Sequence, residues 1–343
     1  MRLARDDTGY QIGETVQMTK GGWTGVALTM SLLAAGVAPA GAAESGVGFY
    51  LLGSRGPMAG FIPPPGAYFQ NDAYYYSGNA SASRNLPFNG QIVAGVDARV
   101  WVEMPTLLWS TPVEILGGNL AFSVTRPIGG PSINVGARLT GPLGNTIASG
   151  LHDSVFTYGD PVLAAMVGWH HGNFHWQTGV MVNTPIGDYR EGALANIAFH
   201  RWGSDVYGAF TWLDPKIGLD LSLAAGVTFN GTNDFTQYRT GNEFHLEWAA
   251  EQHFSKQFSM GLIGYYYQQI TGDSGPGATL GPFKGSVVAL GGTMGFNFDV
   301  AQLPWSVRLK VYKGSACREP VGGRGGLLDA RDPAVCGADW RDR

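Results

Sequence analysis

The stretch Gln91–Met104 reads QIVAGVDARVWVEM, and nearly every second residue in it is apolar. In an extended chain the apolar side chains would fall on one side: Ile92, Ala94, Val96, Ala98, Val100, Val102 and Met104. The charged side chains of Asp97, Arg99 and Glu103 would fall on the other. A period of two indicates a β-strand whose two faces meet different surroundings. Strands of soluble proteins usually have about five or six residues, whereas a tilted strand across a membrane needs about 9–11, so this stretch predicts a membrane-spanning strand.

The same alternation recurs later in the chain, with either parity. In residues 219–230, leucine, valine and phenylalanine alternate with Asp220, Ser222 and other small or polar residues. In residues 243–251, phenylalanine, leucine and tryptophan alternate with acidic residues and a histidine. A charge that faces lipid near the midplane costs about 2–4 kcal/mol, so charges are expected on the lumen side. The predicted lumen-facing residues are Asp97, Arg99, Glu103, Glu243, His245, Glu247 and Glu251.

These patterns predict an all-β fold, a transmembrane antiparallel β-barrel of about 12–14 strands formed by residues 67–313. A large soluble β-sandwich also alternates between inside and outside, but its strands are shorter. Composition favours the barrel, because only 14% of residues are charged, against about 25% in ordinary soluble domains. Aromatic triplets at 74–76 and 265–267 are typical of the girdles at lipid–water interfaces. The net charge of −4 leaves no basic stripe, so nucleic acid is not expected as a partner.

The spacing of the predicted strands adds a second argument. Short turns are predicted at 171–173, 214–216 and 255–257. Long links are predicted at 140–159, 183–203, 230–241 and 271–284. An alternation of short and long connections is typical of barrels with short periplasmic turns and long external loops. The pattern leaves open whether residues 105–116 form a loop or a strand.

Residues 1–43 are predicted to be a secretory signal peptide. Lys20 precedes an apolar stretch at 26–38, and small residues follow as far as Ala43. This order is typical of an export signal, with cleavage expected after Ala42 or Ala43. A transmembrane helix is the alternative, but the strongly apolar part is too short for one. Met18 is an alternative start of translation, because residues 1–17 place three acidic residues ahead of the signal.

The segment 44–66 reads ESGVGFYLLGSRGPMAGFIPPPG, which is too apolar for a solvated tail. Its three consecutive prolines exclude a central strand. Two interpretations are open: a plug inside the barrel, or a plain lead-in to the first strand. The predicted plug or ligand contacts are Phe49, Tyr50, Leu51, Met58, Phe61 and Ile62.

One strand is missing from the predicted count at the C-terminal end. If the short turns are periplasmic, the strand at 304–313 ends outside the cell, whereas an even strand number keeps both termini inside. Residues 314–343 contain both cysteines and no alternating run. Two explanations are open. Either the reading frame was lost after about Lys313, or the tail is a natural disordered extension, in which export would permit a Cys317–Cys336 disulfide.

Four segments of the chain resemble one known family. They are YLLGSRGPMAGFIPPPGAYFQND at 50–72, TPIGDY at 184–189, GVTFNGTNDFTQYRTGNEFHLEWA at 226–249 and GLIGYYYQQITGDSG at 261–275. The family is named for the meta pathway of phenol degradation, and its members are predicted outer-membrane transporters. The resemblance covers residues 44–313 and implies a proteobacterial barrel linked with uptake of aromatic or other small hydrophobic compounds. It carries over no catalytic or ligand-contact residues.

The expected function is passive uptake of small hydrophobic or phenol-like compounds across the bacterial outer membrane. Outer-membrane lipid and the permeating compound are the expected partners, and the oligomeric state is left open. A general porin or a purely structural barrel are the alternatives. The acidic residues assigned to the lumen outnumber the basic ones, which predicts a preference for neutral phenols over their carboxylate analogues.

An enzyme is not expected. The sequence contains no G-x-S-x-G, P-loop or H-E-x-x-H motif. A hydrolase embedded in the barrel is the less favoured alternative, because no serine has an evident histidine and acid partner. His170, His171 and His175 flank a predicted turn and could suggest a metal, but histidines at a strand end are the commoner explanation. No catalytic residue, metal site or cofactor is therefore predicted.

Overall fold

The computed structural model describes residues 27–36, 48–86, 90–140, 146–278, 281–282 and 284–319. The predicted cleavage site and most of the predicted tail lie outside these residues. The described chain forms strands β1 Ala27–Gly36, β2 Gly66–Leu86, β3 Gly90–Ile115, β4 Gly118–Thr125, β5 Ile128–Thr140, β6 Thr146–Ser154, β7 Thr157–Tyr158, β8 Val162–His171, β9 Phe174–Asn183, β10 Gly203–Asp214, β11 Leu219–Asn230, β12 Thr232–Asn233, β13 Tyr238–Arg239, β14 Glu243–His253, β15 Phe258–Gln269, β16 Lys284–Val300 and β17 Leu303–Glu319. Within the described part, no helix is long and apolar enough to cross a membrane.

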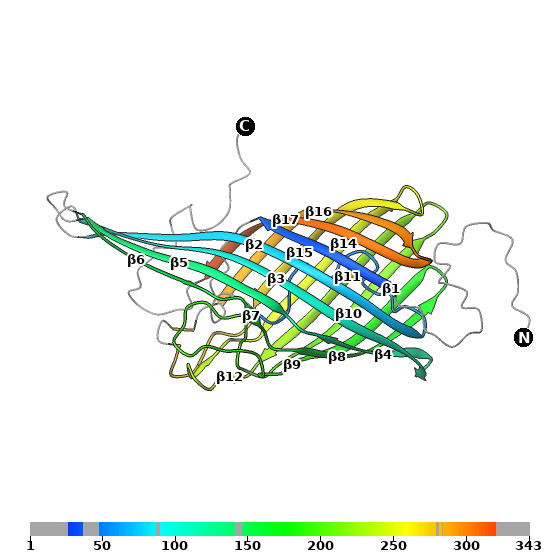
Figure 1. The fold of residues 1–343 in the computed structure, drawn as a ribbon, viewed down its shortest axis with the longest axis horizontal. Coiled ribbons are helices and arrows are strands. Elements are labelled where there is room, and N and C mark those ends of the chain that lie inside the picture. The colour runs from blue at the N-terminus through cyan, green and yellow to red at the C-terminus, as the bar shows by residue number, and fades with distance from the viewer. Residues whose placement is uncertain are drawn as a thin grey trace, which may run out of the picture.

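The wall of the barrel is antiparallel, as predicted. Its strands follow the order β2-β3-β4-β8-β9-β10-β11-β14-β15-β16-β17, and each pairs antiparallel with the next. The strands wrap around a common interior (Figure 1). β5 pairs with the far half of β3, and β6 and β7 pair with β5, so these three strands lie off the wall. The fold class predicted from the alternation of residues is confirmed.

The two edge strands of this wall, β2 and β17, run in the same direction. Each neighbour along the order is antiparallel, so an odd number of strands brings two parallel strands together at the seam. Among the described strands, β1 occupies this seam and pairs parallel with both β17 and β2. β1 belongs to the predicted signal peptide, whose cleavage stays a prediction. A strand antiparallel to both edges would complete an even barrel.

From β8 onward the connections follow the predicted alternation of short and long, whereas the predicted long link at 140–159 contains strands β6 and β7. Residues 105–116, left open above, continue β3 to Ile115 and end in a tight turn at Leu116 and Gly117, both at positive φ (50° and 75°). The turn between β16 and β17 has Ala301 at φ 51° and Gln302 at φ 64°. Two central residues at positive φ define the type I′ turn, whose twist matches that of paired strands. β17 continues to Glu319, six residues past the predicted end of the barrel at Lys313.

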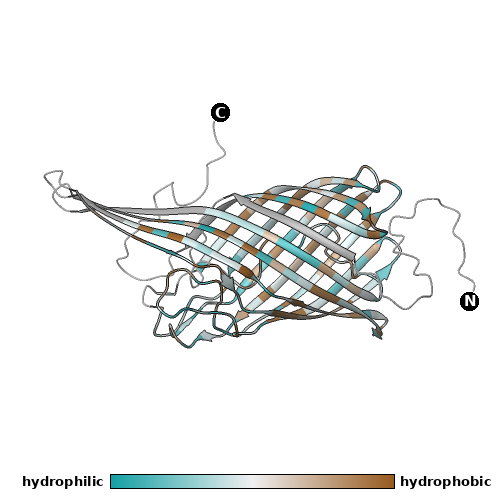
Figure 2. Ribbon diagram, in the orientation of Figure 1, coloured by the Kyte–Doolittle hydropathy of each residue, from teal (hydrophilic) through white to brown (hydrophobic). Residues whose placement is uncertain are grey.

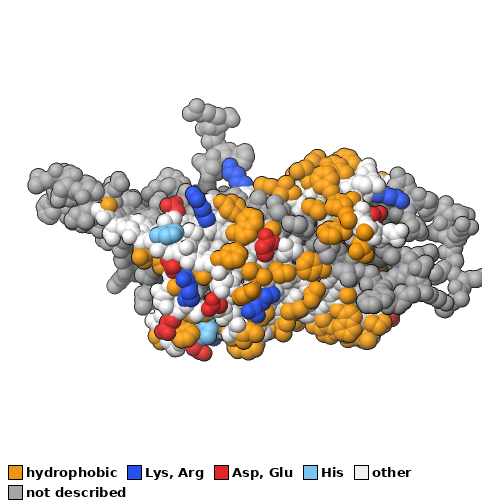
Figure 3. All heavy atoms as spheres, in the orientation of Figure 1, with side chains coloured by type: hydrophobic (Ala, Val, Ile, Leu, Met, Phe, Trp, Pro, Cys, Tyr) orange, Lys and Arg blue, Asp and Glu red, His pale blue; other side chains and the backbone are white. Residues whose placement is uncertain are grey.

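Alternate residues of the wall strands are buried and exposed. On β14 the buried side carries Glu243, His245, Glu247, Ala249 and Glu251. The outer side of the neighbouring strands is apolar, with exposed side chains that include Phe210, Leu221, Leu223, Leu262 and Leu290. Figure 2 shows the resulting alternation of hydropathy along the strands, and Figure 3 shows hydrophobic side chains around the barrel body on the face in view. A wall that is apolar outside and polar inside fits the hydrocarbon of a bilayer.

The prediction that Asp97, Arg99 and Glu103 face the lumen is wrong. Their neighbours of the same parity on β3, Trp101 and Trp109, are 46% and 56% exposed. Residues of the other parity point inward. Val102 is buried and pairs with Tyr74, which packs against the core, and Ser110 is buried and donates to the carbonyl oxygen of Pro63.

The reason lies in the length of β3. The part that contains Asp97 and Arg99 pairs with β2 on one side and, on the other, with β5 instead of the wall strand β4. The ends of β2, β3, β5 and β6 project together past the barrel body (Figure 1). Both charged side chains are exposed there. Glu103 accepts a hydrogen bond from Asn71 Nδ2 at 2.6 Å on the same outer face. Charges sort to the lumen only where lipid covers the outer face, so the rule does not apply beyond the bilayer.

Candidate functional site in the barrel interior

The segment 48–65, here called the interior segment, lies inside the barrel and contacts the inner faces of β3, β9, β10, β11, β14 and β17. Tyr50 is its most deeply held aromatic residue, with 7% of its surface exposed. The Tyr50 hydroxyl donates to Glu247 Oε1 at 2.7 Å, and its ring stacks on the His245 imidazole with 3.7 Å between ring centroids. Burial and the adjacent Glu247 raise the pKa of Tyr50 well above its usual value. The hydroxyl therefore stays protonated and can donate.

The next part of the segment is held through its backbone. Lys310 Nζ donates to the carbonyl oxygens of Gly53 at 3.1 Å and Ser54 at 2.7 Å, and the Tyr312 hydroxyl donates to Gly53 at 3.1 Å. Gly53 has φ +82°, and a Cβ there would lie 2.7 Å from the Tyr312 ring, so only glycine fits without strain. The Arg55 guanidinium lies 3.6 Å from the centroid of the Tyr207 ring. Such a cation–π contact is strengthened when it is shielded from water.

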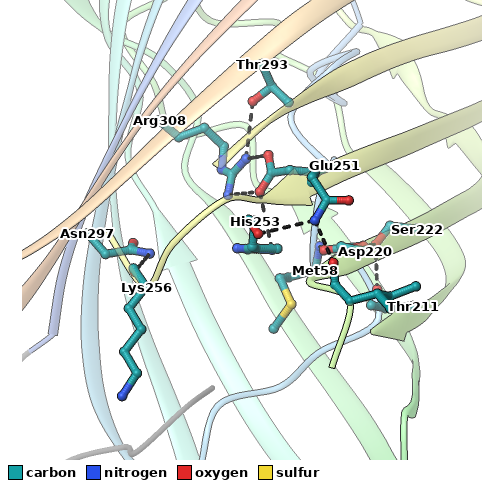
Figure 4. Close-up of polar contacts among 12 residues, drawn as sticks. Met58, Thr211, Asp220, Ser222, Glu251, His253, Lys256, Thr293, Asn297 and Arg308 are labelled. Atoms are coloured by element: carbon teal, nitrogen blue, oxygen red, sulfur yellow. Dashed lines mark hydrogen bonds and ion pairs between the residues drawn. The ribbon is translucent and has the colours of Figure 1, made fainter. Parts of the chain in front are cut away.

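The last part of the segment is anchored by polar side chains of the opposite wall. The Met58 amide donates to Asp220 Oδ2 at 2.7 Å, and the Gly60 amide donates to Thr211 Oγ1 at 2.9 Å. Gln177 Nε2 donates to the carbonyl oxygen of Ala59 at 2.5 Å. Figure 4 shows Asp220 between Met58 and Ser222, with Thr211 close by. Because buried backbone groups need hydrogen-bond partners, these anchors fix the path of a segment that has no regular secondary structure.

The apolar side chains that were predicted as plug or ligand contacts pack beside glycines or against small residues of the wall. Phe49 fills the space beside Gly203, where a Cβ would lie 2.6 Å from the ring, and Ile62 fills that beside Gly168 at 2.7 Å. Leu51 packs against the buried cluster of Ala249, Ile263, Ala289 and Tyr312, and Phe61 contacts the rings of His170 and His175. Tyr74 and Tyr265 pack on the same cluster from inside the barrel rather than in a girdle. Met58 differs from the other five predicted contacts. The contact described for it above is made by its backbone amide and not by its side chain.

The inner face carries more buried carboxylates than cations. The buried charged residues of the wall strands are Asp72, Asp205, Asp220, Glu243, Glu247, Glu251 and Lys310. Arg308 forms two hydrogen bonds with Glu251 and a third with Thr293 Oγ1 at 3.2 Å (Figure 4). His245 Nε2 lies 2.9 Å from Asp205 Oδ2, and both side chains are buried. Buried charges are tolerated where they are paired and hydrogen-bonded in this way.

Three polar atoms near Tyr50 are buried and have no hydrogen-bond partner among the described residues: Asp205 Oδ1, His245 Nδ1 and Glu247 Oε2. An unpaired buried polar atom is costly, so such atoms mark a place for water or for a polar group of a ligand. In the part of the chain that the structure describes, no three His, Cys, Asp or Glu side chains gather closely enough to hold a metal ion. The interior can therefore offer hydrogen bonds and ring stacking to a small molecule.

Comparison with known proteins gives a matching family and a similar solved structure. Residues 70–323 match the model of a family described as "Putative MetA-pathway of phenol degradation". The chain belongs to this family. Among solved structures it is similar to the COG4313 outer membrane channel from Pseudomonas putida F1, with 15% sequence identity, a TM-score of 0.50, and coverage of 72% of this chain and 88% of that one. No curated protein matches the chain.

Family membership and the barrel fold place the chain in the bacterial outer membrane, and the family links it to phenol degradation. The resemblance stated from the sequence is confirmed. In this family member the short turns lie at one end of the barrel, and the long links lie at the other.

The long link between β9 and β10 is organised around one buried carboxylate. Asp160 Oδ1 accepts from the Gly187 amide at 2.8 Å, and Oδ2 accepts from the amides of Phe199 at 2.8 Å and His200 at 3.1 Å. The Asn183 side chain donates to the same Oδ2 at 3.2 Å. The rings of Tyr189, His200 and Phe235 pack together, with centroids 4.5–5.7 Å apart, and Tyr189 stacks on the other two. The loops at this end are therefore packed against each other.

Replacing Asp160 by alanine is expected to release the 184–202 link. The change leaves three backbone N–H groups without their acceptor, each at a cost of about 1–3 kcal/mol if it stays buried. Limited proteolysis of the folded protein should then cut within 184–202 much faster than in the wild type. The control is Asp188→Ala, which removes a carboxylate from the same link that binds the exposed Thr157 hydroxyl. Equal cleavage rates for the two variants would contradict the role assigned to Asp160.

Several interior residues were not singled out from the sequence. Asp205 and Tyr207 lie on β10, where the alternation SDVYGAFTWLD carries the same period of two as β14. This alternation could have identified the inner face of β10 from the sequence, but it is weaker than on β14 because threonine and alanine also lie on the inner side. Arg55 and the carbonyl groups of Gly53 and Ser54 had no comparable signal, because a segment without regular structure has no period.

Proposed function

We propose that this protein is a passive channel for small, neutral aromatic or hydrophobic compounds, and that the interior segment is its plug. The observation that carries the proposal is the segment itself. Its apolar side chains fill the inside of a barrel whose inner wall is polar, and its backbone is hydrogen-bonded to five strands. Family membership supports a role connected with phenol degradation.

The interior offers a small aromatic molecule the contacts that the segment already uses. Phe49, Leu51 and Ile62 are apolar surfaces beside buried polar groups. Pockets for small molecules typically combine apolar surface with a few placed polar groups. The excess of buried carboxylates opposes anions, because a like charge near 4–6 Å disfavours the ionised form. Neutral phenols should therefore pass in preference to carboxylates such as benzoate.

A general porin would have a water-filled lumen open to sugars. The seated segment argues against free passage of such solutes, because buried side chains occupy the path. A purely structural barrel would pass neither class of molecule. These two alternatives make different predictions from a selective channel in the same assay.

Vesicles with lipopolysaccharide in the outer leaflet provide the test, because they resist phenol better than simple phospholipid bilayers. Reconstituted protein should raise the uptake of radiolabelled phenol over protein-free vesicles. Uptake of phenol should exceed that of benzoate by roughly tenfold at neutral pH, which corresponds to about 1.4 kcal/mol. Swelling in sugars at ordinary porin rates would favour the porin, and no uptake of either solute would favour the structural barrel.

A further inference from the structure

The side chain of Tyr50 is itself a phenol, and the barrel contacts both parts of it. The ring lies face to face with the His245 imidazole, at 3.7 Å between centroids and 20° between planes. The hydroxyl donates to Glu247 Oε1 at 2.7 Å. Tyr50, His245 and Glu247 are all buried. A neutral molecule that combines an aromatic ring with one hydroxyl donor would find the same two contacts.

We propose that Tyr50 occupies a binding site for a phenolic ring, and that a permeating phenol loosens the plug by taking the place of Tyr50. This inference rests on the proposed function, since it names the substrate class and the gating of the same interior. The site selects phenols by chemistry. Benzene would leave the buried Glu247 without a donor, and a benzoate would set a second carboxylate against it.

Exchange has a stepwise path through the second oxygen of the same carboxylate. Glu247 Oε2 is buried without a hydrogen-bond partner in the described part of the chain. It can accept a bond from an incoming hydroxyl while Oε1 still holds Tyr50. His245 Nδ1 and Asp205 Oδ1 also have no partner within the described chain, and they belong to the ring that Tyr50 stacks on and to the carboxylate bonded to that ring. The site therefore keeps hydrogen-bonding atoms that Tyr50 does not occupy.

Only the start of the interior segment needs to move for this exchange. Lys310 and Tyr312 hold the carbonyl of Gly53, and Asp220 and Thr211 hold the segment further on. Gly53 has φ +82°, a conformation that glycine adopts without cost. Residues 48–52 can therefore swing about Gly53 while the remaining anchors stay in place.

The test compares two variants that each remove one tyrosine hydroxyl. Tyr50→Phe removes the bond to Glu247 but keeps the ring, whereas Tyr238→Phe removes a hydroxyl that is bonded to Asp273 in the long links. Single-channel conductance is recorded in planar bilayers with phenol, anisole or benzoate, and the heat-modifiable gel shift verifies folding. In the wild type, phenol should raise conductance saturably, and anisole, which has no hydroxyl donor, should not.

Tyr50→Phe should lower the half-maximal phenol concentration, because the side chain at position 50 then competes less strongly with phenol for the site. The expected change is roughly tenfold, which corresponds to about 1.4 kcal/mol. Tyr238→Phe should leave that concentration unchanged. An equal response to anisole and phenol, or an equal shift in the two variants, would overturn the inference. Phenol uptake by vesicles without any phenol effect on conductance would overturn the gating role alone. Absence of phenol uptake would instead remove the proposed function. The wild-type comparison of phenol with anisole decides the matter even if a variant does not fold.

Discussion

Replacing Gly60 by valine should unseat the plug and convert the barrel into an open pore. A Cβ at Gly60 would lie 2.5 Å from the carbonyl oxygen of His175 and 2.7 Å from the amide nitrogen of Thr211. Both are backbone atoms of wall strands, which cannot shift without breaking the sheet. The Gly60 amide would also lose its bond to Thr211 Oγ1. We expect a rise in single-channel conductance and swelling of vesicles in sugars that the wild type excludes.

The matched control for this variant is Gly66→Ala, at the first residue of β2, directly after the interior segment. A Cβ there would meet only the flexible Tyr68 side chain, at 3.3 Å. This control should keep the conductance of the wild type. If Gly60→Val also conducts like the wild type while remaining folded, the interior segment does not control passage.

The largest effect on stability is expected at the ion pair of Glu251 and Arg308. Glu251 is fully buried, and Glu251→Leu would leave the Arg308 guanidinium without its carboxylate. Removing one partner of a buried pair costs about 3–5 kcal/mol, and the lower end applies because the Arg308 side chain keeps 19% of its surface exposed. Urea unfolding of the protein in detergent measures this loss.

The double variant Glu251→Leu/Arg308→Met is the control for that measurement. It removes both charges, so no unpaired ion remains inside the barrel, and an apolar pair of similar volume is often as stable as the ion pair. Most of the lost stability should therefore return. Equal destabilisation in the single and double variants would show that packing, rather than charge, dominates at this site.

The two strands with the clearest alternation, β3 and β14, show how far the sequence alone could lead. A period of two identifies a strand and separates its faces, but it does not say which face points inward. The cost of charge in lipid indicates that direction only where lipid covers the outer face. On β14 the charged residues lie on the buried side of the wall. On β3 the residues Asp97 and Arg99 lie in a projecting part that pairs with β5, where lipid does not decide the outer face.

The interior site was harder to predict for a different reason. Tyr50 and Glu247 are 197 positions apart in the chain, and Lys310 and Gly53 are 257 apart. An apolar composition and three prolines were enough to suggest a segment inside the barrel. They could not name its partners, because those depend on the stagger of eleven strands. Backbone carbonyls, which accept the bonds of Lys310, leave no mark in the sequence.

The length of the β2–β3 hairpin has a consequence for the cell surface. β3 has 26 residues, and at about 3.4 Å per residue it extends for roughly 88 Å, against a hydrocarbon core of about 30 Å. Even with a tilt of about 45°, the hairpin rises well clear of the bilayer on the side of the long links, which in such barrels is the outside. Together with β5 and β6 it forms a blade that stands among the sugars of the lipopolysaccharide. Antibodies, phages and neighbouring cells would meet this blade before they meet the channel.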